Sequence, residues 1–231
     1  MTPEEIRALK EKIKRANDGR ERRKFDAGFE IRAIGDDDAG QTLTGYAARF
    51  NSWSDNLGGF IERIRPGAFK KALMTSDVRA LYNHNSNQLP LGRIPKTLRL
   101  AEDTKGLKME NDLPVDPGTN ALTRFANDLV IAINRGDITQ MSFGFTVAED
   151  GDEWHEKDGV VRRTIHEVRE LFDVSPVVFP AYSATKVAVR TIERLENFLK
   201  SAETSGDKGA TARRRQEDEK RERFFKTMNY F

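Results

Sequence analysis

The sequence contains no cysteine and only three histidines. The absence of cysteine excludes disulfide bonds and thiolate catalysis, and it fits a protein that works in a reducing compartment. With three histidines in 231 residues, a dedicated metal site would need an unusual share of carboxylate ligands. We therefore predict a protein with no bound metal ion and no cofactor.

Long apolar runs and a strong net charge are also missing. No stretch approaches the roughly 18 apolar residues that a membrane span needs, and the N-terminus lacks the apolar core of a signal peptide. The 39 basic and 37 acidic side chains leave a formal net charge of only +2, so no global field attracts nucleic acid. We expect a soluble, unsecreted protein without a membrane or a specific nucleic acid as partner.

The two ends of the chain differ in composition from its middle. Residues 1–24 are basic and carry a thin apolar stripe, and residues 203–231 combine small residues with alternating charge blocks. At 37% hydrophobic residues the chain has enough apolar side chains for one modest core. We predict a basic N-terminal arm over 1–24, one globular domain over 25–202 and a flexible charged tail over 203–231.

The middle of the chain is dominated by short β-type runs bounded by Gly, Asp, Asn or Pro. These runs cover residues 29–34, 43–50, 60–64, 78–84, 96–103, 106–113, 141–149 and 160–179. Helical spacing is predicted over 66–73, 120–137 and 191–202. The pattern indicates a mostly β protein with helices (α+β), whose largely antiparallel sheet closes into a barrel or forms a sandwich.

Few residues in these runs are candidates for chemistry. A serine hydroxyl is a poor nucleophile unless a base lies within hydrogen-bond reach, and that base needs a partner that fixes its tautomer. Ser142, His84 and Glu167 are suited to these three roles. The residue types alone equally allow Ser142 to be a small strand residue, His84 a surface side chain and Glu167 a cross-strand partner of a neighbouring arginine.

The other two histidines are weaker candidates. His155 lies in an acidic segment between glycines, and we expect it to be solvated. His166 is adjacent to Glu167, so on a strand the two side chains point to opposite faces and only one of them can face a given site.

The ordered series of segments resembles the prohead maturation proteases of tailed bacteriophages, which are distant relatives of the herpesvirus assemblins. The resemblance runs from about residue 29 to residue 190. Its segments are "LTGYAARFN", "GGFIERIRPGAFKKAL", "DVRALYNHN", "LGR", "TLRLAEDTKGLKMENDLP", "RGDITQMSFGF", "RTIHEVRELFDVSPVVFPAY" and "TKVAVR".

The resemblance implies a serine endopeptidase on an assemblin-like closed antiparallel β-barrel surrounded by helices. It makes Ser142 the nucleophile and His84 the base. It places the third member on the strand before the "SPVVFPAY" run, most naturally at Glu167, with His166 next and Glu170 or Asp173 as further alternatives. Backbone donors for an oxyanion are expected near Asp173–Val177.

The resemblance also implies a biological role. The family cleaves scaffold and capsid-protein segments, and often its own ends, inside the procapsid that assembles in the host cytoplasm. A homodimer is a further expectation. The alternatives are a capsid-associated scaffold or structural protein that kept the fold without the chemistry, and a nucleic-acid-binding β-barrel, which would require a basic groove with interleaved aromatic residues.

Overall fold

The computed structural model describes residues 20–34, 40–57, 59–178 and 189–204. The strands are β1 (Glu21–Asp26), β2 (Glu30–Ala33), β3 (Gln41–Arg49), β4 (Phe60–Ile64), β5 (Arg79–Ala80), β6 (Gly92–Arg93), β7 (Leu98–Glu102), β8 (Gly106–Asp112), β9 (Gln140–Val147), β10 (Asp152–Lys157), β11 (Val160–Ile165) and β12 (Val168–Val177). The helices are α2 (Lys70–Thr75), α3 (Arg124–Asn134) and α4 (Val189–Thr204). The mostly β, α+β prediction is therefore confirmed.

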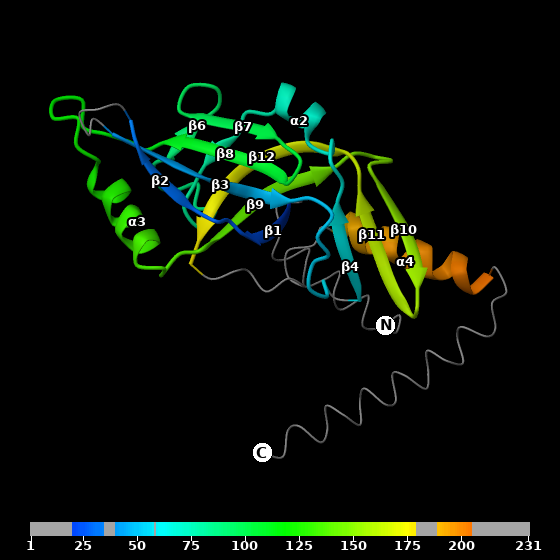
Figure 1. Cartoon of the computed structure of the whole chain (residues 1–231). Helices are drawn as coiled ribbons and strands as arrows, with labels where there is room; N and C mark the ends of the chain where they lie inside the picture. Colours follow the sequence, from blue (N-terminus) through cyan, green and yellow to red (C-terminus); the bar gives the residue numbers. More distant parts are fainter. Residues whose placement is uncertain (1–19, 35–39, 58, 179–188, 205–231) are drawn as a thin grey trace, which may run out of the picture.

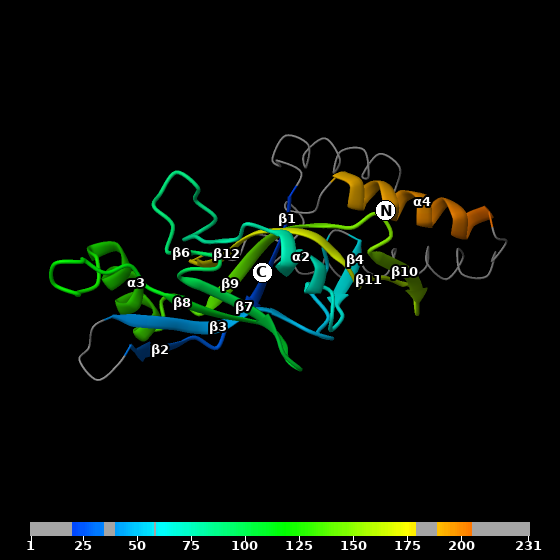
Figure 2. The same cartoon turned by 90° about the horizontal axis from the view of Figure 1, so that it is seen from above.

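The described strands form three separate sheets. Their orders are β1-β9-β12-β5-β6, β10-β11-β4 and β2-β3-β8-β7. The three-stranded sheet lies at one end of the molecule and α3 at the other (Figures 1 and 2). The prediction of a closed barrel is wrong, because β1 and β6 remain unjoined ends of their sheet. Alternating runs fix which residues face inward, but they do not specify whether the outer strands meet.

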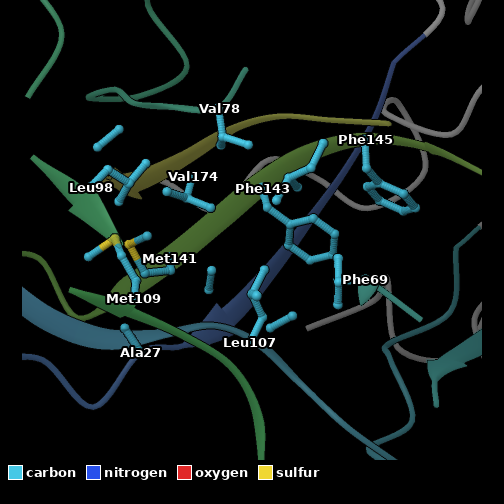
Figure 3. Close-up of a cluster of buried hydrophobic side chains, with 14 of the residues drawn as sticks. Ala27, Phe69, Val78, Leu98, Leu107, Met109, Met141, Phe143, Phe145 and Val174 are labelled. Atoms are coloured by element: carbon cyan, nitrogen blue, oxygen red, sulfur yellow. The ribbon is translucent and has the colours of Figure 1, made fainter. Parts of the chain in front are cut away.

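The main core lies between the five-stranded and four-stranded sheets. Met141, Phe143 and Phe145 of β9 are fully buried, and Met141 and Phe143 point toward Met109 and Leu107 of β8 (Figure 3). The Phe143 ring packs 5.5 Å from the Phe69 ring and 4.8 Å from the Phe145 ring, measured between centroids. Because side chains alternate along a strand, this arrangement directs Ser142 to the opposite face of β9.

The described helices overlap the predicted segments, but they do not form a layer that surrounds the sheets. The α2 helix is shorter than predicted and lies against β12, whereas α3 buries Ala126, Leu129 and Val130. Gly136, with φ of 81°, follows the end of α3. The α4 helix buries Ile192 and Leu195 in a second, smaller core beside the three-stranded sheet. None of the described helices is long and apolar enough to cross a membrane.

Three strands, β1, the two-residue β6 and β10, lie where none was predicted. The β1 strand begins at Glu21, so the predicted domain boundary after residue 24 falls inside a strand that pairs with β9. The β10 strand occupies the acidic segment around His155, whose side chain is exposed as predicted. Residues 1–19 and 205–231 lie outside the described residues, so the proposed arm and tail stay predictions there.

A buried ion cluster explains why a strand as charged as β1 lies inside the fold. We define it as Glu21, Arg23, Glu62, Asp152 and Arg163. Its contacts are Arg23 Nε to Glu62 Oε1 at 2.5 Å, Arg23 Nη2 to Glu21 Oε2 at 2.6 Å, Arg163 Nη1 to Glu21 Oε2 at 2.8 Å and Arg163 Nε to Asp152 Oδ2 at 2.7 Å. The cluster joins β1 to both strands of the parallel pair β4–β11 and to β10.

The α4 helix is attached to the same ion cluster. Thr191 donates a hydrogen bond to Glu21 Oε1 at 2.7 Å, and Arg194 is hydrogen-bonded to Asp152. Figure 1 shows α4 beside β10 and β11. The N-terminal strand that pairs with β9 is therefore linked through buried charges to the C-terminal helix.

The ion cluster predicts a loss of stability in acid. Burial raises the pKa of the Glu21 carboxyl, but the charges of Arg163 and Arg23 lower it by more than burial raises it. The net pKa is about 2, compared with 4.5 for a free glutamate. Because the unfolded chain binds this proton first, the stabilisation is complete above the unfolded pKa and is lost as the pH falls toward 2. We expect Glu21 to account for a decrease of about 3 kcal/mol in the free energy of unfolding.

Urea unfolding at pH 7, 4.5 and 2.5 checks this expectation. In Glu21→Gln the acid-dependent decrease is expected to be smaller by the contribution of this one carboxyl. Equal pH dependence in the two proteins would contradict it.

Candidate active site

The site is built on the face of β9 opposite the core. In the strand register, Ser142 lies between Lys24 of β1 and Ser175 of β12. Ser142 is 4% exposed, so its hydroxyl is fixed by close packing and not free in solvent. A nucleophile held between paired strands keeps its geometry because the strands on both sides restrict it.

His84 reaches this face from the segment that follows β5. Leu81 N donates to Val174 O at 3.0 Å and Asn83 N donates to Pro176 O at 3.0 Å, so the segment continues along β12. Asn83 and His84 then both adopt left-handed backbone conformations, with φ of 52° and 57°. Such conformations cost about 1–3 kcal/mol each in non-glycine residues and gather at functional sites.

Ser142, His84 and Asp173 form a continuous hydrogen-bond chain. The His84 Nε2 atom lies 2.6 Å from Ser142 Oγ, and His84 Nδ1 lies 2.5 Å from Asp173 Oδ1. With Nδ1–H donating to the carboxylate, Nε2 is left to accept the Ser142 hydroxyl proton. This is the arrangement of nucleophile, base and orienting acid that acyl transfer requires.

Asp173 is held in its ionised form. Burial raises the pKa of its carboxyl, but the hydrogen bond and charge of His84, together with Ser175 and Arg22, outweigh this effect. The Ser175 hydroxyl donates to Asp173 Oδ1 at 2.6 Å, and the positive charge of Arg22 contributes from β1. The net pKa of Asp173 is therefore below its usual range, and the carboxylate can stabilise a positive charge on His84.

Glu167, the expected partner of the base, does not contact His84 in the structure, where Asp173 lies instead. Glu167 lies in the connection between β11 and β12, where its Oε2 accepts a hydrogen bond from Lys71 Nζ at 2.7 Å. His166 lies in the same connection, and its Nε2 donates to the Asp150 carbonyl at 2.7 Å. Glu170 is exposed, which leaves Asp173 as the acid that meets His84.

A signal for Asp173 is present in the sequence. It is a single acid within the otherwise uncharged run "LFDVSPVVF", and an isolated buried charge needs a partner. Strand alternation alone does not predict that Asp173 faces His84, because the β12–β9 register shifts between Leu171 and Asp173. The expected oxyanion donors around Asp173–Val177 lie within β12, and that expectation stays a prediction.

Gly144 provides the space that the Asp173 carboxylate occupies. It lies between Arg22 and Asp173 in the strand register, and a Cβ atom added to it would lie 2.5 Å from Asp173 Oδ2. Gly144→Ala is therefore expected to displace the carboxylate from His84. We expect kcat to fall by about 100-fold, the effect of a misplacement near 1 Å.

Steady-state kinetics and thermal unfolding of Gly144→Ala test this expectation, with Gly118→Ala on an exposed turn as control. We expect Gly144→Ala to lose kcat while the protein stays folded. It would be refuted by Gly144→Ala retaining the kcat of the control.

Comparisons with known proteins identify the family. Residues 28–201 match the family model described as caudovirus prohead serine protease. The prohead protease of Enterobacteria phage HK97 is 35% identical over 182 residues, which cover 75% of this chain and 73% of that protein. Among solved structures, the capsid assembly protease of bacteriophage T4 matches 71% of this chain and 100% of its own, with a TM-score of 0.39 and 12% identity. The chain thus belongs to the caudovirus prohead serine protease family.

Proposed function

We propose that this capsid maturation protease is a serine-type endopeptidase with Ser142 as nucleophile, His84 as general base and Asp173 as the acid that orients the base. The observation that carries the proposal is the unbroken chain of hydrogen bonds from Ser142 Oγ through both His84 nitrogens to the Asp173 carboxylate. The geometry supports the proposal because the three residues come from segments distant in sequence: β9, β12 and the segment that follows β5.

The reaction follows from the protonation states of these groups. His84 Nε2 takes the hydroxyl proton as Ser142 Oγ attacks the peptide carbonyl, and Asp173 stabilises the resulting imidazolium. His84 then gives this proton to the leaving amine, which leaves an acyl group on Ser142. Water, deprotonated by His84, attacks the ester, and the released proton returns to Ser142.

The family and the names of its relatives support a viral substrate. We propose that the enzyme cleaves scaffold and capsid-protein segments inside the assembling procapsid of the host cell. Trimming of its own ends, residues 1–19 and 205–231 among them, is part of the same proposal. The family match and the three converging side chains favour catalysis over a purely structural capsid protein.

Co-expression with the major capsid protein of the same phage tests the proposal. Wild-type protein is expected to produce capsid-protein fragments that are absent with Ser142→Ala. The control is Ser201→Ala, which removes a hydroxyl from α4. Identical fragment patterns with the wild type and Ser142→Ala would refute the serine mechanism.

A further inference from the structure

A pocket of about 220 Å³ lies along the outer edge of β1. This edge is opposite to the one that pairs with β9, because β1 is the last strand of its sheet. The pocket is lined by residues 22–26 of β1, by residues 52–55 and Leu57, and by residues 62–64 of β4. It is smaller than the roughly 300–1,000 Å³ that encloses a drug-sized ligand, so it suits a single large side chain.

The pocket surface left for a ligand is mainly apolar. Phe25, Leu57 and Ile64 line it together with Trp53, which is 38% exposed. Among the charged groups around these side chains, Lys24, Glu62 and Arg63 already have partners. Lys24 Nζ lies 3.8 Å from Asp55 Oδ2, and Glu62 belongs to the buried ion cluster. The Arg63 guanidinium stacks 4.8 Å from the centre of the Trp53 ring.

The pocket lies next to the proposed active site, with Lys24 between them. Lys24 lines the pocket and is the direct cross-strand partner of Ser142, so the two side chains stand on the same face of the sheet. Adjacent strands are about 4.8 Å apart, and the pocket lies one further spacing beyond β1. A peptide that crosses β1 from Ser142 therefore reaches the pocket after about 10 Å.

The outer edge of β1 offers backbone groups to a peptide that reaches it. Ala27 N donates to Thr139 O, so the backbone N–H and C=O groups of every second residue, counted back from Ala27, point toward β9. The groups of the residues between them point away from β9. The N–H and C=O groups of Lys24 consequently point toward the pocket side. By the same alternation the Arg22 carbonyl points to this side, where it accepts a hydrogen bond from Arg23 Nη1 at 2.9 Å.

We infer that this pocket is a substrate subsite that binds a large aliphatic or aromatic side chain of the cleaved polypeptide. At about 3.3 Å per extended residue, the side chain belongs to a residue about three positions from the scissile bond. Trp53 forms its exposed wall and Lys24 separates it from the nucleophile. The inference rests on the proposed function, because it requires a peptide positioned on Ser142.

Cleavage-site profiling tests the subsite. The full-length protein is incubated with a library of peptides from a denatured proteome, and cleavage sites are read by mass spectrometry. We expect the wild type to prefer large apolar residues about three positions from the cut. In Trp53→Ala this preference is expected to fall about 10-fold, because the contact of an apolar side chain with its pocket is lost.

Two controls separate a lost subsite from a damaged fold. Trp53→Phe keeps an aromatic wall and is expected to retain the preference. Met74→Ala removes an apolar side chain that is 77% exposed on α2 and is expected to leave the profile unchanged. Thermal unfolding of each variant confirms that it is folded.

The outcomes distinguish the subsite from the proposed function. Cleavage that depends on Ser142 but shows the same profile in the wild type and Trp53→Ala would overturn the subsite alone. Cleavage that persists in Ser142→Ala, or the absence of any Ser142-dependent cleavage of library peptides and co-expressed capsid protein, would overturn the proposed function and with it the subsite.

Discussion

Asp173→Asn is expected to lower kcat for peptide cleavage by about 10³- to 10⁴-fold while the protein stays folded. The amide keeps the size of the carboxylate but removes the charge that stabilises the His84 imidazolium. It also offers an NH₂ group to Nδ1, which favours the tautomer whose Nε2 carries a proton and cannot accept one from Ser142. Single-turnover kinetics on a capsid-protein peptide measures the effect on the chemical step.

Glu167→Gln is the matched control for this prediction. It makes the same chemical change at the acid that the sequence favoured, and it removes only a partly exposed ion pair with Lys71. Such pairs contribute about 0–1 kcal/mol, so we expect kcat to remain within about twofold of the wild type. A large loss in Glu167→Gln together with an active Asp173→Asn would restore Glu167 as the third residue and refute the assignment of Asp173.

Arg163→Met is expected to destabilise the protein by about 3–5 kcal/mol, the usual effect of removing one partner from a buried ion pair. The Arg163 side chain is 1% exposed and contacts Glu21, Glu62 and Asp152. Its positive charge is lost in the variant, while the three carboxylates stay buried. Because Glu21 belongs to the strand that pairs with β9, we also expect reduced cleavage activity. Urea unfolding at pH 7 measures the change in free energy.

Arg32→Met is the surface control for Arg163→Met. Arg32 also pairs with a carboxylate, that of Glu30, but its side chain is 58% exposed. A change below about 1 kcal/mol is expected there. Equal destabilisation by the two substitutions would show that the buried cluster contributes no more than a surface pair.

The strand that carries the nucleophile was predictable because its pattern is local. In "QMSFGF", large apolar residues alternate with small ones, and that alternation alone places Met141 and Phe143 in the core and Ser142 on the other face. The position of His84 at the end of an apolar run was visible in the same way. The resemblance to prohead proteases then connected the two residues, and the structure brings them within 2.6 Å.

The missed features depend on contacts between segments distant in sequence. The charged sequence of β1 is typical of a solvated arm. Its burial depends on Glu62 and Arg163, more than 30 positions away, which neutralise the charges of Arg23 and Glu21. Asp173 was hidden by the register shift in β12, whose extent depends on the strand it pairs with. Whether the outer strands close a barrel is likewise a property of the assembled sheet and not of any one segment.

The most direct test of the Ser142–His84–Asp173 assignment is covalent labelling with a fluorophosphonate, which transfers its phosphonyl group to an activated serine oxygen and releases fluoride. Intact-mass and peptide mass spectrometry measure the extent and position of labelling. We predict one phosphonyl group on Ser142 in the wild type and in Glu167→Gln, strongly slowed labelling in Asp173→Asn and none in His84→Ala. Labelling at another residue, or labelling of Ser142 at an equal rate in the wild type and His84→Ala, would contradict the assignment.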